Sequence, residues 1–559
     1  MKFTTDQLII GVFSFLLFPA SYAFALFLVT HTSWCLSDSC VTQPLIQNNL
    51  SIYYGFLVFT LISVVTASRY AALKRFLYKR FLLGSTITIG EATWFLLALA
   101  VLLICGILSY KDWSPKFSRT RSGANLILFT AFVASGDCLA VLFGLVMLPV
   151  SKHSFMATFV GVPYTSLLRV HIWLGRLMAV LTTFHMGALI ASYVITKQDI
   201  IGKIFAVQPP SPYAGTTAQW GSSRYQPIMG NAAFGTLIII TVTSLSFFRR
   251  KWYNVFYFTH FLVLALIVLS YFHASSNVYY LLPGLGMYTI DGILRLYSRY
   301  TIDKVSAVLF EKPEYVTLTI STTKACRSLP GQFMRVCLPA ISKTEMHPWS
   351  IVKSTETSVS FMFRRDGLVV GSWTDLVVKH LMEKYGRDDV EGVDVVLQGP
   401  FGAPLDVGGE KDVLVFFVGG TGLSAYLDAI RHVVMAFSNG QQGNVLVVWS
   451  TRGVEASSLS HLWELQELAG AGNNGKLVVE AIETKGDGSG RVDLNQVLEK
   501  YVSPLVRSGN DKNCRALEVG VYICGPAGFN KDAMKAAHVF SKKAGKGVKL
   551  EVDIGSYEL

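Results

Sequence analysis

Four histidines lie inside long apolar stretches of the chain, where an ionisable side chain is costly and indicates function. His171 and His185 share one stretch, and His260 and His273 share another. The members of each pair are 14 and 13 residues apart, which at about 1.5 Å per residue separates them by roughly 20 Å along a helix. If the two stretches run the same way, His171 and His260 lie at one depth and His185 and His273 at another, which is the arrangement that two stacked bis-histidine haems require. The pattern therefore predicts four ligands to haem iron and electron transfer across a membrane.

The spacing within each stretch decides whether its two histidines face the same way. Fourteen residues is close to four turns of about 3.6 residues, so His171 and His185 share a helix face. Thirteen residues takes the second pair off a shared face, so that stretch needs a kink or a π-bulge. Gly175 and Gly187 would let a flat macrocycle approach the backbone, or would pack helices together. The alternative interpretation is that the four histidines are isolated polar packing residues.

The elements that must position these histidines are membrane-spanning helices. Hydrophobic residues make up 51% of the 559 residues and charged residues 15%, against about 25% charged in an ordinary soluble domain. The composition excludes a purely soluble or a disordered protein. A span needs roughly 20 apolar residues, and the first candidate is either a span or a cleaved signal peptide. The eight candidate spans are about 8–30, 52–68, 92–110, 124–148, 167–194, 231–248, 255–273 and 278–297.

Charge is distributed unevenly along the chain. Residues 1–300 hold 21 lysines and arginines against 7 acidic residues, whereas residues 301–559 hold 28 against 30. The basic clusters lie between apolar stretches, as cytoplasmic loops do, so a nucleic acid partner is not expected. The clusters at 69–80, 249–251 and 295–299 fall on one side of alternating spans and predict a cytosolic C-terminal half. One loop disagrees and would lie on the opposite side, with Lys111, Lys116, Arg119 and Arg121.

Other polar residues near the spans have two interpretations each. Asp137 and Asp291 lie at membrane depth. They are either proton or ion sites, or they pair with a neighbouring arginine or backbone group. Cys35 and Cys40 flank a polar loop. They either form a disulfide, if the loop faces an oxidising side, or remain two free thiols. The sequon Asn49-Leu50-Ser51 is so close to the next span that its glycosylation is not expected.

After residue 300 the hydrophobic pattern becomes short and alternating. Period-two alternation predicts antiparallel strands up to about residue 405. From residue 411 strands alternate with helical stretches, which predicts a doubly wound α/β unit that binds ligands at the carboxyl ends of its strands. Strands are expected at 413–418, 445–449, 477–482 and 519–524, a helix at 423–437, and a flexible loop with no clear helix after it at 486–490.

A glycine turn follows the first of these parallel strands. Gly419, Gly420, Thr421 and Gly422 would let a pyrophosphate approach the backbone at a helix N-terminus. Any tight connection between a strand and a helix can use the same residues, so this turn alone is weak evidence for a nucleotide.

Motifs around the membrane histidines resemble a known family. His171-Ile172-Trp173-Leu174-Gly175-Arg176, followed by His185, is similar to the first haem helix of the ferric reductase/NADPH oxidase superfamily. Arg250, Tyr253 and Phe256 ahead of His260, with His273 beyond, resemble its second haem helix. The resemblance covers about residues 90–559 and implies two b-type haems, one held by His171 and His260 and the other by His185 and His273.

Three short motifs of the second half resemble flavin-binding elements of the same superfamily. His347-Pro348-Trp349-Ser350 resembles its His-Pro-Phe-Thr motif, with two departures that keep an aromatic ring and a hydroxyl. Gly371-Ser372-Trp373-Thr374 resembles the element at the flavin phosphates. Gly399-Pro400-Phe401-Gly402 resembles the joint between the flavin and nucleotide subdomains. The resemblance implies that these residues bind FAD, with His347 facing its pyrophosphate.

Further motifs resemble the nucleotide-binding elements. Gly419-Gly420-Thr421-Gly422 is similar to the pyridine-nucleotide loop, and Cys524-Gly525-Pro526 is similar to the element beside the nicotinamide. Arg452 follows a strand, where an arginine binds a 2′-phosphate and favours NADPH over NADH, or it is an ordinary surface arginine. Tyr557 lies where the family often places an aromatic residue over the flavin, although a terminal strand residue would look the same.

The resemblance implies a multi-pass α-helical membrane domain, a bis-haem bundle, followed by a cytosolic ferredoxin-reductase-like unit. The expected domains are two extra N-terminal spans at 1–90, a six-helix haem-binding domain at 91–300, an antiparallel β-barrel for FAD at 301–408 and a doubly wound α/β domain for NADPH at 409–559.

The implied function is that of a metalloreductase in a plasma membrane or an endomembrane. Electrons would pass from NADPH through FAD and two haems to ferric chelates or cupric ions on the opposite side, with no catalytic residue beyond the cofactors. The loop at 196–229, with Lys203 and Arg224, would attract anionic chelates. The alternatives are an NADPH oxidase that produces superoxide and an inactive electron-transfer or sensor subunit. The expected partners are an external electron acceptor and membrane lipid. Whether the protein forms a homo-oligomer is not predicted.

Overall fold

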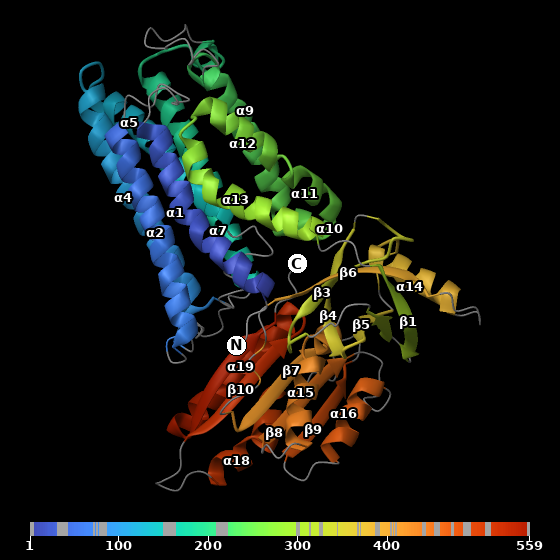
Figure 1. The fold of residues 1–559 in the computed structure, drawn as a ribbon. Coiled ribbons are helices and arrows are strands. Elements are labelled where there is room, and N and C mark those ends of the chain that lie inside the picture. The colour runs from blue at the N-terminus through green and yellow to red at the C-terminus, as the bar shows by residue number, and fades with distance from the viewer. Residues whose placement is uncertain are drawn as a thin grey trace. The chain divides into compact units, whose positions relative to one another are not determined.

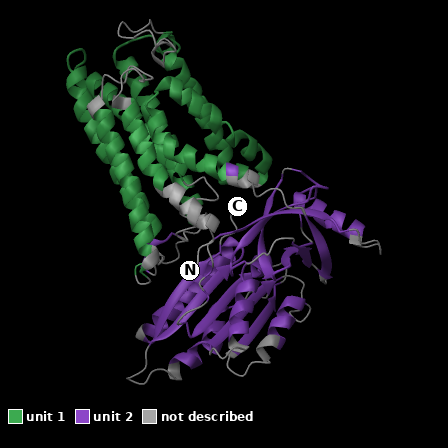
Figure 2. Cartoon of the chain, viewed as in Figure 1, with its two compact units in different colours: residues 1–74, 90–292 green, residues 75–89, 293–559 purple. Residues whose placement is uncertain are grey.

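The computed structural model divides the chain into two compact units, residues 1–74 with 90–292 and residues 75–89 with 293–559 (Figure 2). We call them the membrane unit and the flavin–nucleotide unit. The described residues are 5–30, 43–70, 73, 76–77, 87–148, 164–207, 222–297, 302–311, 315–322, 328–343, 345–365, 368, 370–385, 392–402, 405, 407, 411–438, 443–451, 459–470, 475–484, 493–508 and 516–555. The pair Cys35 and Cys40 lies outside them.

Helices form at all eight expected spans of the membrane unit (Figure 1). Within the described residues, six spans are long and apolar enough to cross a membrane, which confirms a multi-pass membrane protein. In the first expected span, only the shorter stretch Leu16–Leu28 counts as an apolar helix among the described residues. The helices are α1 (Thr5–Thr30), α2 (Gln43–Arg69), α4 (Ile89–Phe117), α5 (Gly123–Met147), α7 (Tyr164–Ile195), α9 (Ser222–Ser244), α11 (Tyr253–His260) with α12 (Val263–His273), and α13 (Asn277–Tyr297).

The seventh expected span is broken between its two histidines. It consists of α11, which ends at His260, and α12, which begins at Val263. Phe261 and Leu262 form the turn between them, and their amides donate to the carbonyls of Phe258 and Thr259, three residues back. These tighter hydrogen bonds change the angular advance per residue. The break is therefore the correction that a spacing of 13 residues requires.

Aromatic hydroxyls bind α2 to α13 in the core of the membrane unit. Tyr53 and Tyr54 donate to the carbonyls of Tyr280 and Tyr279, at 2.9 and 2.8 Å. The sequon residue Asn49 is also buried on α2, and its amide donates to Ser109 Oγ at 3.3 Å. A buried, hydrogen-bonded asparagine offers no acceptor site for a glycan.

The flavin–nucleotide unit begins with a closed six-stranded antiparallel barrel in the order β1-β2-β5-β4-β3-β6. Its strands are β1 (Ile302–Glu311), β2 (Tyr315–Ser321), β3 (Phe333–Cys337), β4 (His347–Ser354), β5 (Ser358–Arg364) and β6 (Asp394–Phe401). The expectation of strands alone up to residue 405 was incomplete, because the helix α14 (Trp373–Tyr385) lies between β5 and β6. Its residues Trp373, Val377 and Leu381 recur at helical spacing and are buried in the barrel core.

The second part of this unit is a five-stranded parallel sheet in the order β11-β10-β7-β8-β9. Successive side chains of β7 point to opposite faces, and both faces are buried by helices. The α15 and α16 side packs on Phe416 and Val418, and the α17 and α19 side packs on Val415 and Phe417. The elements are β7 (Val413–Gly419), α15 (Leu427–Ser438), β8 (Gly443–Thr451), α16 (Ser460–Gly470), β9 (Gly475–Glu483), α17 (Leu494–Tyr501), α18 (Ser503–Ser508), β10 (Leu517–Cys524), α19 (Ala527–Ala544) and β11 (Val548–Ile554).

The expected barrel and α/β sheet are confirmed, with two local corrections. The helix expected from residue 423 begins at Leu427, because Gly420–Ala425 first forms a 3₁₀ turn. A helix also follows the glycine-rich segment 486–490, where none was expected. Asp493 caps this helix, α17, by accepting from the amide of Asn495 at 2.9 Å.

Candidate functional site

The membrane unit brings the four histidines together as two facing pairs. The ring centres of His171 and His260 are 6.1 Å apart, and those of His185 and His273 are 6.3 Å apart. An imidazole nitrogen binds a metal ion at about 2.0 Å, so one metal atom between two imidazoles separates the ring centres by about 6 Å. Each pair is therefore spaced to hold a single metal atom.

Hydrogen bonds fix the tautomer of three of these imidazoles. The Nδ1 atoms of His171, His185 and His273 lie 2.9, 2.8 and 2.8 Å from the carbonyls of Val146, Phe132 and Gln226. A carbonyl oxygen only accepts, so each Nδ1 carries the proton and donates. Each Nε2 then keeps a lone pair for a metal, as second-shell hydrogen bonds provide in metal sites.

The fourth histidine has a hydroxyl in the corresponding place. His260 Nδ1 is 3.5 Å from Ser244 Oγ, and that hydroxyl donates to the carbonyl of Ile240 at 2.6 Å. The serine oxygen is thus free to accept from His260. All four imidazoles can present an unprotonated Nε2 at once.

Glycines provide the space around the histidine rings. A Cβ atom on Gly230 would lie 2.6 Å from His273 Nδ1, and one on Gly136 would lie 3.0 Å from His185 Cε1. By contrast, a Cβ on Gly175 or Gly187 would meet no atom within 4 Å. These two glycines therefore border open space beside the histidine helix α7, as a flat macrocycle would need. Within the described residues no group of three or more histidine, cysteine, aspartate or glutamate side chains is placed to hold a metal ion.

The flavin motif His347-Pro348-Trp349-Ser350 forms the start of β4, next to two other expected flavin elements. The His347 ring stacks on Trp373 at 4.0 Å between ring centres, and Trp349 contacts Trp373 edge to face at 5.4 Å. Burial lowers the pKa of His347, which keeps its ring neutral at pH 7. Trp373 Nε1 is buried and has no hydrogen-bond partner among the described residues, so it can donate to a bound group.

The element Gly371-Ser372-Trp373-Thr374 forms the turn into α14, with Trp373 and Thr374 in the first helical turn. Gly371 has a φ of +77°, in the left-handed region that favours glycine. Its amide donates to Asp375 Oδ2 at 2.8 Å, and Lys379 donates to the same oxygen at 2.9 Å. The hydrogen bond from Lys379 and that from Gly371 lower the pKa of Asp375. The carboxylate thus already binds one amide of this helix N-terminus.

The third flavin element lies on β6, two strands from His347. Phe333 on β3 pairs with Ser350 on one side and with Phe401 on the other. Gly399 has a φ of +136° and precedes Pro400, and a Cβ on it would lie 3.1 Å from Met334 Cγ. The barrel therefore brings all three flavin motifs onto β4, β6 and α14, around β3.

The two nucleotide motifs contact each other at the carboxyl edge of the parallel sheet. β7 and β10 are neighbours, so Gly419 and Cys524 end adjacent strands. A Cβ on Gly422 would clash with the Cys524 carbonyl oxygen, and one on Gly419 would lie 2.9 Å from Pro526 Cδ. Gly420 has a φ of +56°, and a Cβ on it would meet no atom within 4 Å. At this edge Gly419 and Gly422 pack tightly against Cys524 and Pro526, whereas the backbone at Gly420–Thr421 is accessible. This arrangement suits the binding of an extended phosphate group.

Two expected site residues, Arg452 and Tyr557, lie outside the described residues. The described residues that come before them, Thr451 and Gly555, are at the carboxyl edge of the parallel sheet. Thr451 is the last residue of β8 and binds the Tyr315 hydroxyl at 3.1 Å, at the same sheet edge as Gly419. The amide of Gly555, two residues before Tyr557, donates to the carbonyl of Ile523 at 2.8 Å, next to Cys524. Burial raises the pKa of Cys524 to about 12, so its side chain remains a thiol.

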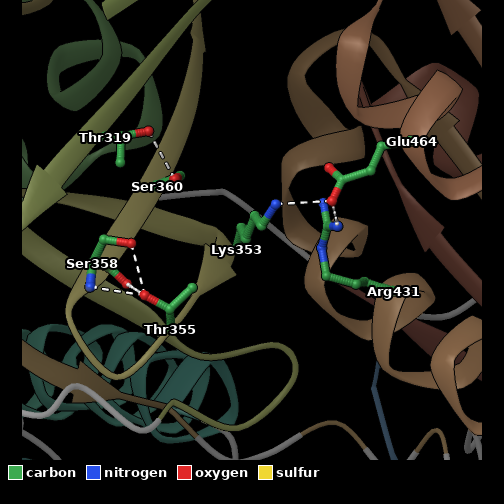
Figure 3. Close-up of polar contacts among 7 residues, drawn as sticks. All are labelled: Thr319, Lys353, Thr355, Ser358, Ser360, Arg431 and Glu464. Atoms are coloured by element: carbon green, nitrogen blue, oxygen red, sulfur yellow. Dashed lines mark hydrogen bonds and ion pairs between the residues drawn. The ribbon is translucent and has the colours of Figure 1, made fainter. Parts of the chain in front are cut away.

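An ion-pair network joins the barrel to the α/β sheet, which sequence reasoning missed. Glu464 Oε1 on α16 accepts from Lys353 on β4 at 2.8 Å and from Arg431 on α15 at 2.6 Å (Figure 3). Partial burial opposes ionisation, but the hydrogen bonds from both cations outweigh it and lower the pKa of Glu464. Arg431 is 7% exposed, and its Nε and Nη2 atoms have no partner among the described residues. Lys353 lies three residues after Ser350, so the network connects the flavin strand to the helix after the glycine turn.

Comparisons with known proteins agree with these elements. Residues 135–271 match the family model described as ferric reductase like transmembrane component, and residues 299–405 match the model described as FAD-binding domain. The first match includes His171, His185 and His260 and ends two residues before His273. The resemblance to the ferric reductase superfamily is therefore confirmed for the membrane histidine helices and for the barrel.

Relatives with curated descriptions are similar at modest identity. The chain is 26% identical over 312 residues to probable ferric reduction oxidase 1 and 24% identical over 363 residues to ferric reduction oxidase 2, both of Arabidopsis thaliana. The matched regions cover 55% and 62% of this chain and 41% and 46% of those proteins, so the chain spans less than half of their length. Among solved structures, the FAD/NAD binding domain of nitric oxide dioxygenase from Vibrio cholerae is 17% identical, with a TM-score of 0.33, and covers 46% of this chain and 100% of that one.

Proposed function

Because the chain carries the ferric reductase transmembrane component and an FAD-binding domain, we propose that it is a transmembrane metalloreductase. It moves electrons from NADPH through FAD and two b-type haems to ferric chelates, and to cupric ions, on the opposite side of the membrane. The observation that carries the proposal is the two facing histidine pairs, each spaced for one metal atom.

The chain's own residues hold and insulate the cofactors. His171 with His260, and His185 with His273, would each bind one haem iron through Nε2, and Gly175 and Gly187 leave space for the macrocycles. A haem supplies reversible one-electron transfer when it is bound. The Nδ1 atoms of His171, His185 and His273 donate to backbone carbonyls, which would hold these imidazole planes in place with a haem bound.

In the flavin–nucleotide unit, residues of the barrel and of the parallel sheet would hold two organic cofactors, FAD and NADPH. Trp349, His347 and Trp373 line the barrel for FAD, whose chemistry converts two-electron into one-electron transfer. The glycine turn at 419–422 would hold the NADPH pyrophosphate, and Cys524-Gly525-Pro526 would lie beside its nicotinamide. Arg452, which follows β8 in the sequence, would bind the 2′-phosphate that distinguishes NADPH from NADH.

We place the flavin–nucleotide unit in the cytosol. α13 leads directly into β1, and the basic residues Arg249, Arg250 and Lys251 follow α9, on the same side of alternating spans. The positive-inside rule assigns such a side to the cytoplasm. A protease-accessible tag at the C-terminus in sealed, right-side-out vesicles would contradict this orientation.

The rival function is an NADPH oxidase that reduces oxygen to superoxide. The sequence Gly-Gly-Thr-Gly-Leu-Ser at 419–424 favours the reductases, whose glycine loop it resembles more closely. The deciding experiment is NADPH-driven reduction of ferric citrate by purified protein loaded with FAD and haem, with and without oxygen. We expect Fe(II) to form at an undiminished anaerobic rate. A rate that collapses without oxygen, and is suppressed in air by superoxide dismutase, would establish the oxidase instead.

A further inference from the structure

The end of the membrane unit at which α4 meets α5 is rich in positive charge. It includes the loop that disagrees with the positive-inside rule. The end of α7 joins it, because Ser192 Oγ donates to Asn125 Oδ1 at 2.6 Å. The basic residues of these segments are Lys111, Lys116, Arg119, Arg121, Lys197 and Lys203. We call this region the basic end.

The acidic residues of the basic end are already engaged. Asp112 pairs with Lys116 at 2.5 Å, and Asp199 accepts from the amide of Gly202 at 3.1 Å as the cap of α8 (Ile200–Ile204). Five cations of the basic end have no carboxylate within ion-pair distance in the part of the chain that the structure describes; they are Lys111, Arg119, Arg121, Lys197 and Lys203. The basic end therefore carries uncompensated positive charge that favours an anionic ligand.

One of these cations is held in a fixed position. The Arg121 guanidinium carbon lies 3.6 Å from the ring centre of Phe129 and 5.4 Å from that of Phe117. Its nearest polar contact is the Thr120 hydroxyl, at 3.5 Å. A guanidinium stacked on an aromatic ring keeps its N–H groups directed parallel to the ring plane, where they can form bidentate hydrogen bonds to a carboxylate. Arg121 is thus preorganised for an anion that displays carboxylates.

A row of aromatic rings connects this arginine to a membrane histidine. Ring centres are 4.9 Å apart for Phe117 and Phe129, 5.6 Å for Phe129 and Phe132, and 4.3 Å for Phe132 and His185. The Phe132 carbonyl also accepts from His185 Nδ1. Arg121 therefore lies at one end of a continuous packed path and His185 at the other. An acceptor bound at Arg121 would be connected to His185 through Phe129 and Phe132, whose rings are in contact.

A buried carboxyl group supports the start of this row. Trp113 stacks on Phe117 at 5.4 Å, and its indole Nε1 donates to Asp137 Oδ2 at 3.2 Å. Lys116 Nζ lies 4.6 Å from the Trp113 ring centre. The contact orients Trp113 and provides a hydrogen-bond partner for the Asp137 carboxyl group.

We propose that the basic end binds an anionic ferric polycarboxylate chelate, with Arg121 as its principal contact and Arg119 and Lys197 as supporting charges. The proposal rests on the proposed function and names the substrate class of that reaction. Each ferric ion accepts one electron, so the oxidation of one NADPH to NADP⁺ and a proton reduces two chelates. The charge that violates the positive-inside rule is then part of the substrate site.

The test separates binding from reduction. The protein, loaded with haem and FAD, is compared as wild type, Arg121→Gln, Arg121→Lys and the surface control Lys476→Gln. Binding is measured with gallium citrate, which cannot be reduced, and reduction with anaerobic ferric citrate and with the cation hexaammineruthenium(III). We expect Arg121→Gln to weaken gallium citrate binding and raise KM for ferric citrate by about tenfold, as for one lost bidentate contact. The rate with the ruthenium cation should not fall, because losing a positive charge does not disfavour a cation; Arg121→Lys should be intermediate with ferric citrate, and Lys476→Gln should match wild type.

Gallium citrate binding and ferric citrate KM that are unchanged in Arg121→Gln, with intact haem spectra, would overturn the site. Active ferric citrate reduction in that case leaves the metalloreductase function in place. If gallium citrate binding depends on Arg121 but no variant reduces iron without oxygen, the site stands as an anion site and the proposed function fails. The two failures are thus distinguishable.

Discussion

The two units of the chain complete their sites in different ways. At the nucleotide edge, motif glycines touch other motif residues, and a Cβ on Gly419 would lie 2.9 Å from Pro526 Cδ. In the membrane unit, Gly175 and Gly187 border open space. Side-chain packing forms the nucleotide edge without a ligand, whereas these two glycines on α7 have no protein atom against them. The comparison indicates that a bound group would supply, in the membrane unit, packing that side chains supply at the nucleotide edge.

Burial along the helices leads to the same conclusion. Protein atoms bury 44% of the spanning window of α2, against 17% for α7 and 11% for the span Tyr253–His273 that contains α11 and α12. The histidine helices are therefore less covered by protein than α2 is. Apolar contacts with a macrocycle would supply part of the stabilisation that α2 obtains from Tyr280 and other core residues.

The largest effect is expected from removing one histidine. His171→Ala should eliminate one of the two haems, because the remaining His260 would be a single axial ligand. The haem-to-protein ratio, measured from the pyridine haemochrome, should fall from two to one, and NADPH-driven ferric reduction should fall more than about a hundredfold. FAD content should stay at the wild-type value.

His432→Ala is the matched control for this histidine, since His432 is exposed on α15 in the other unit. It should retain both haems. Two haems in His171→Ala would mean that the facing histidines are polar packing residues. The proposed difference between the two units, that bound groups complete only the membrane unit, would then be wrong.

The second test places a methyl group against a histidine ring. A Cβ on Gly230 would lie 2.6 Å from His273 Nδ1, whereas one on Gly235 of the same helix would meet nothing within 4 Å. Gly230→Ala should displace His273 and weaken binding of the second haem about tenfold or more. Gly235→Ala should keep full haem content. Equal haem retention in the two variants, measured by haem transfer to an acceptor protein, would show that His273 does not need its observed position.

The third test addresses the packed nucleotide edge. Gly422→Ala forces a Cβ against the Cys524 carbonyl, and overpacking of this kind costs about 1–3 kcal/mol. NADPH-driven flavin reduction, followed by stopped flow, should slow at least about tenfold, with haem content unchanged. The control Gly528→Ala adds a Cβ with no neighbour within 4 Å and should match wild type. A normal rate in Gly422→Ala would mean that this edge does not receive the nucleotide.

Sequence patterns predicted what depends on local periodicity. Apolar stretches predicted the helices, alternation predicted the barrel, and the run 413–418 predicted the central parallel strand, because each reflects burial of one face or of both. The histidine spacing also predicted that the seventh span must deviate from a regular helix. The turn at Phe261–Leu262 provides that deviation.

Features that depend on tertiary contact could not be predicted in this way. Gly136 and Gly230 have no distinctive sequence context, and their role is visible only where a ring from another helix lies against them. The helix α14 was missed because it has only 13 residues and lies between stretches of period-two alternation, where a short apolar run does not distinguish a helix from a strand. The partners of Glu464 come from residues 353 and 431, far apart in sequence, so no short-range signal marks the network.

The smallest expected effect concerns this network, which holds the barrel against the sheet. Glu464→Gln would remove the ion pair of the buried Arg431 and should destabilise the unit by about 1–3 kcal/mol. Lys353→Met removes a half-exposed partner and should cost only about 0–1 kcal/mol. The pKa of Glu464 is lowered by folding, so its stabilisation is fully present above the ordinary value of 4.5 and is lost as pH falls through the folded pKa. The temperature of FAD release should therefore differ between wild type and Glu464→Gln at pH 7 and converge below pH 4.5. A difference that persists at low pH would show that packing of the side chain, and not its charge, joins the two subdomains.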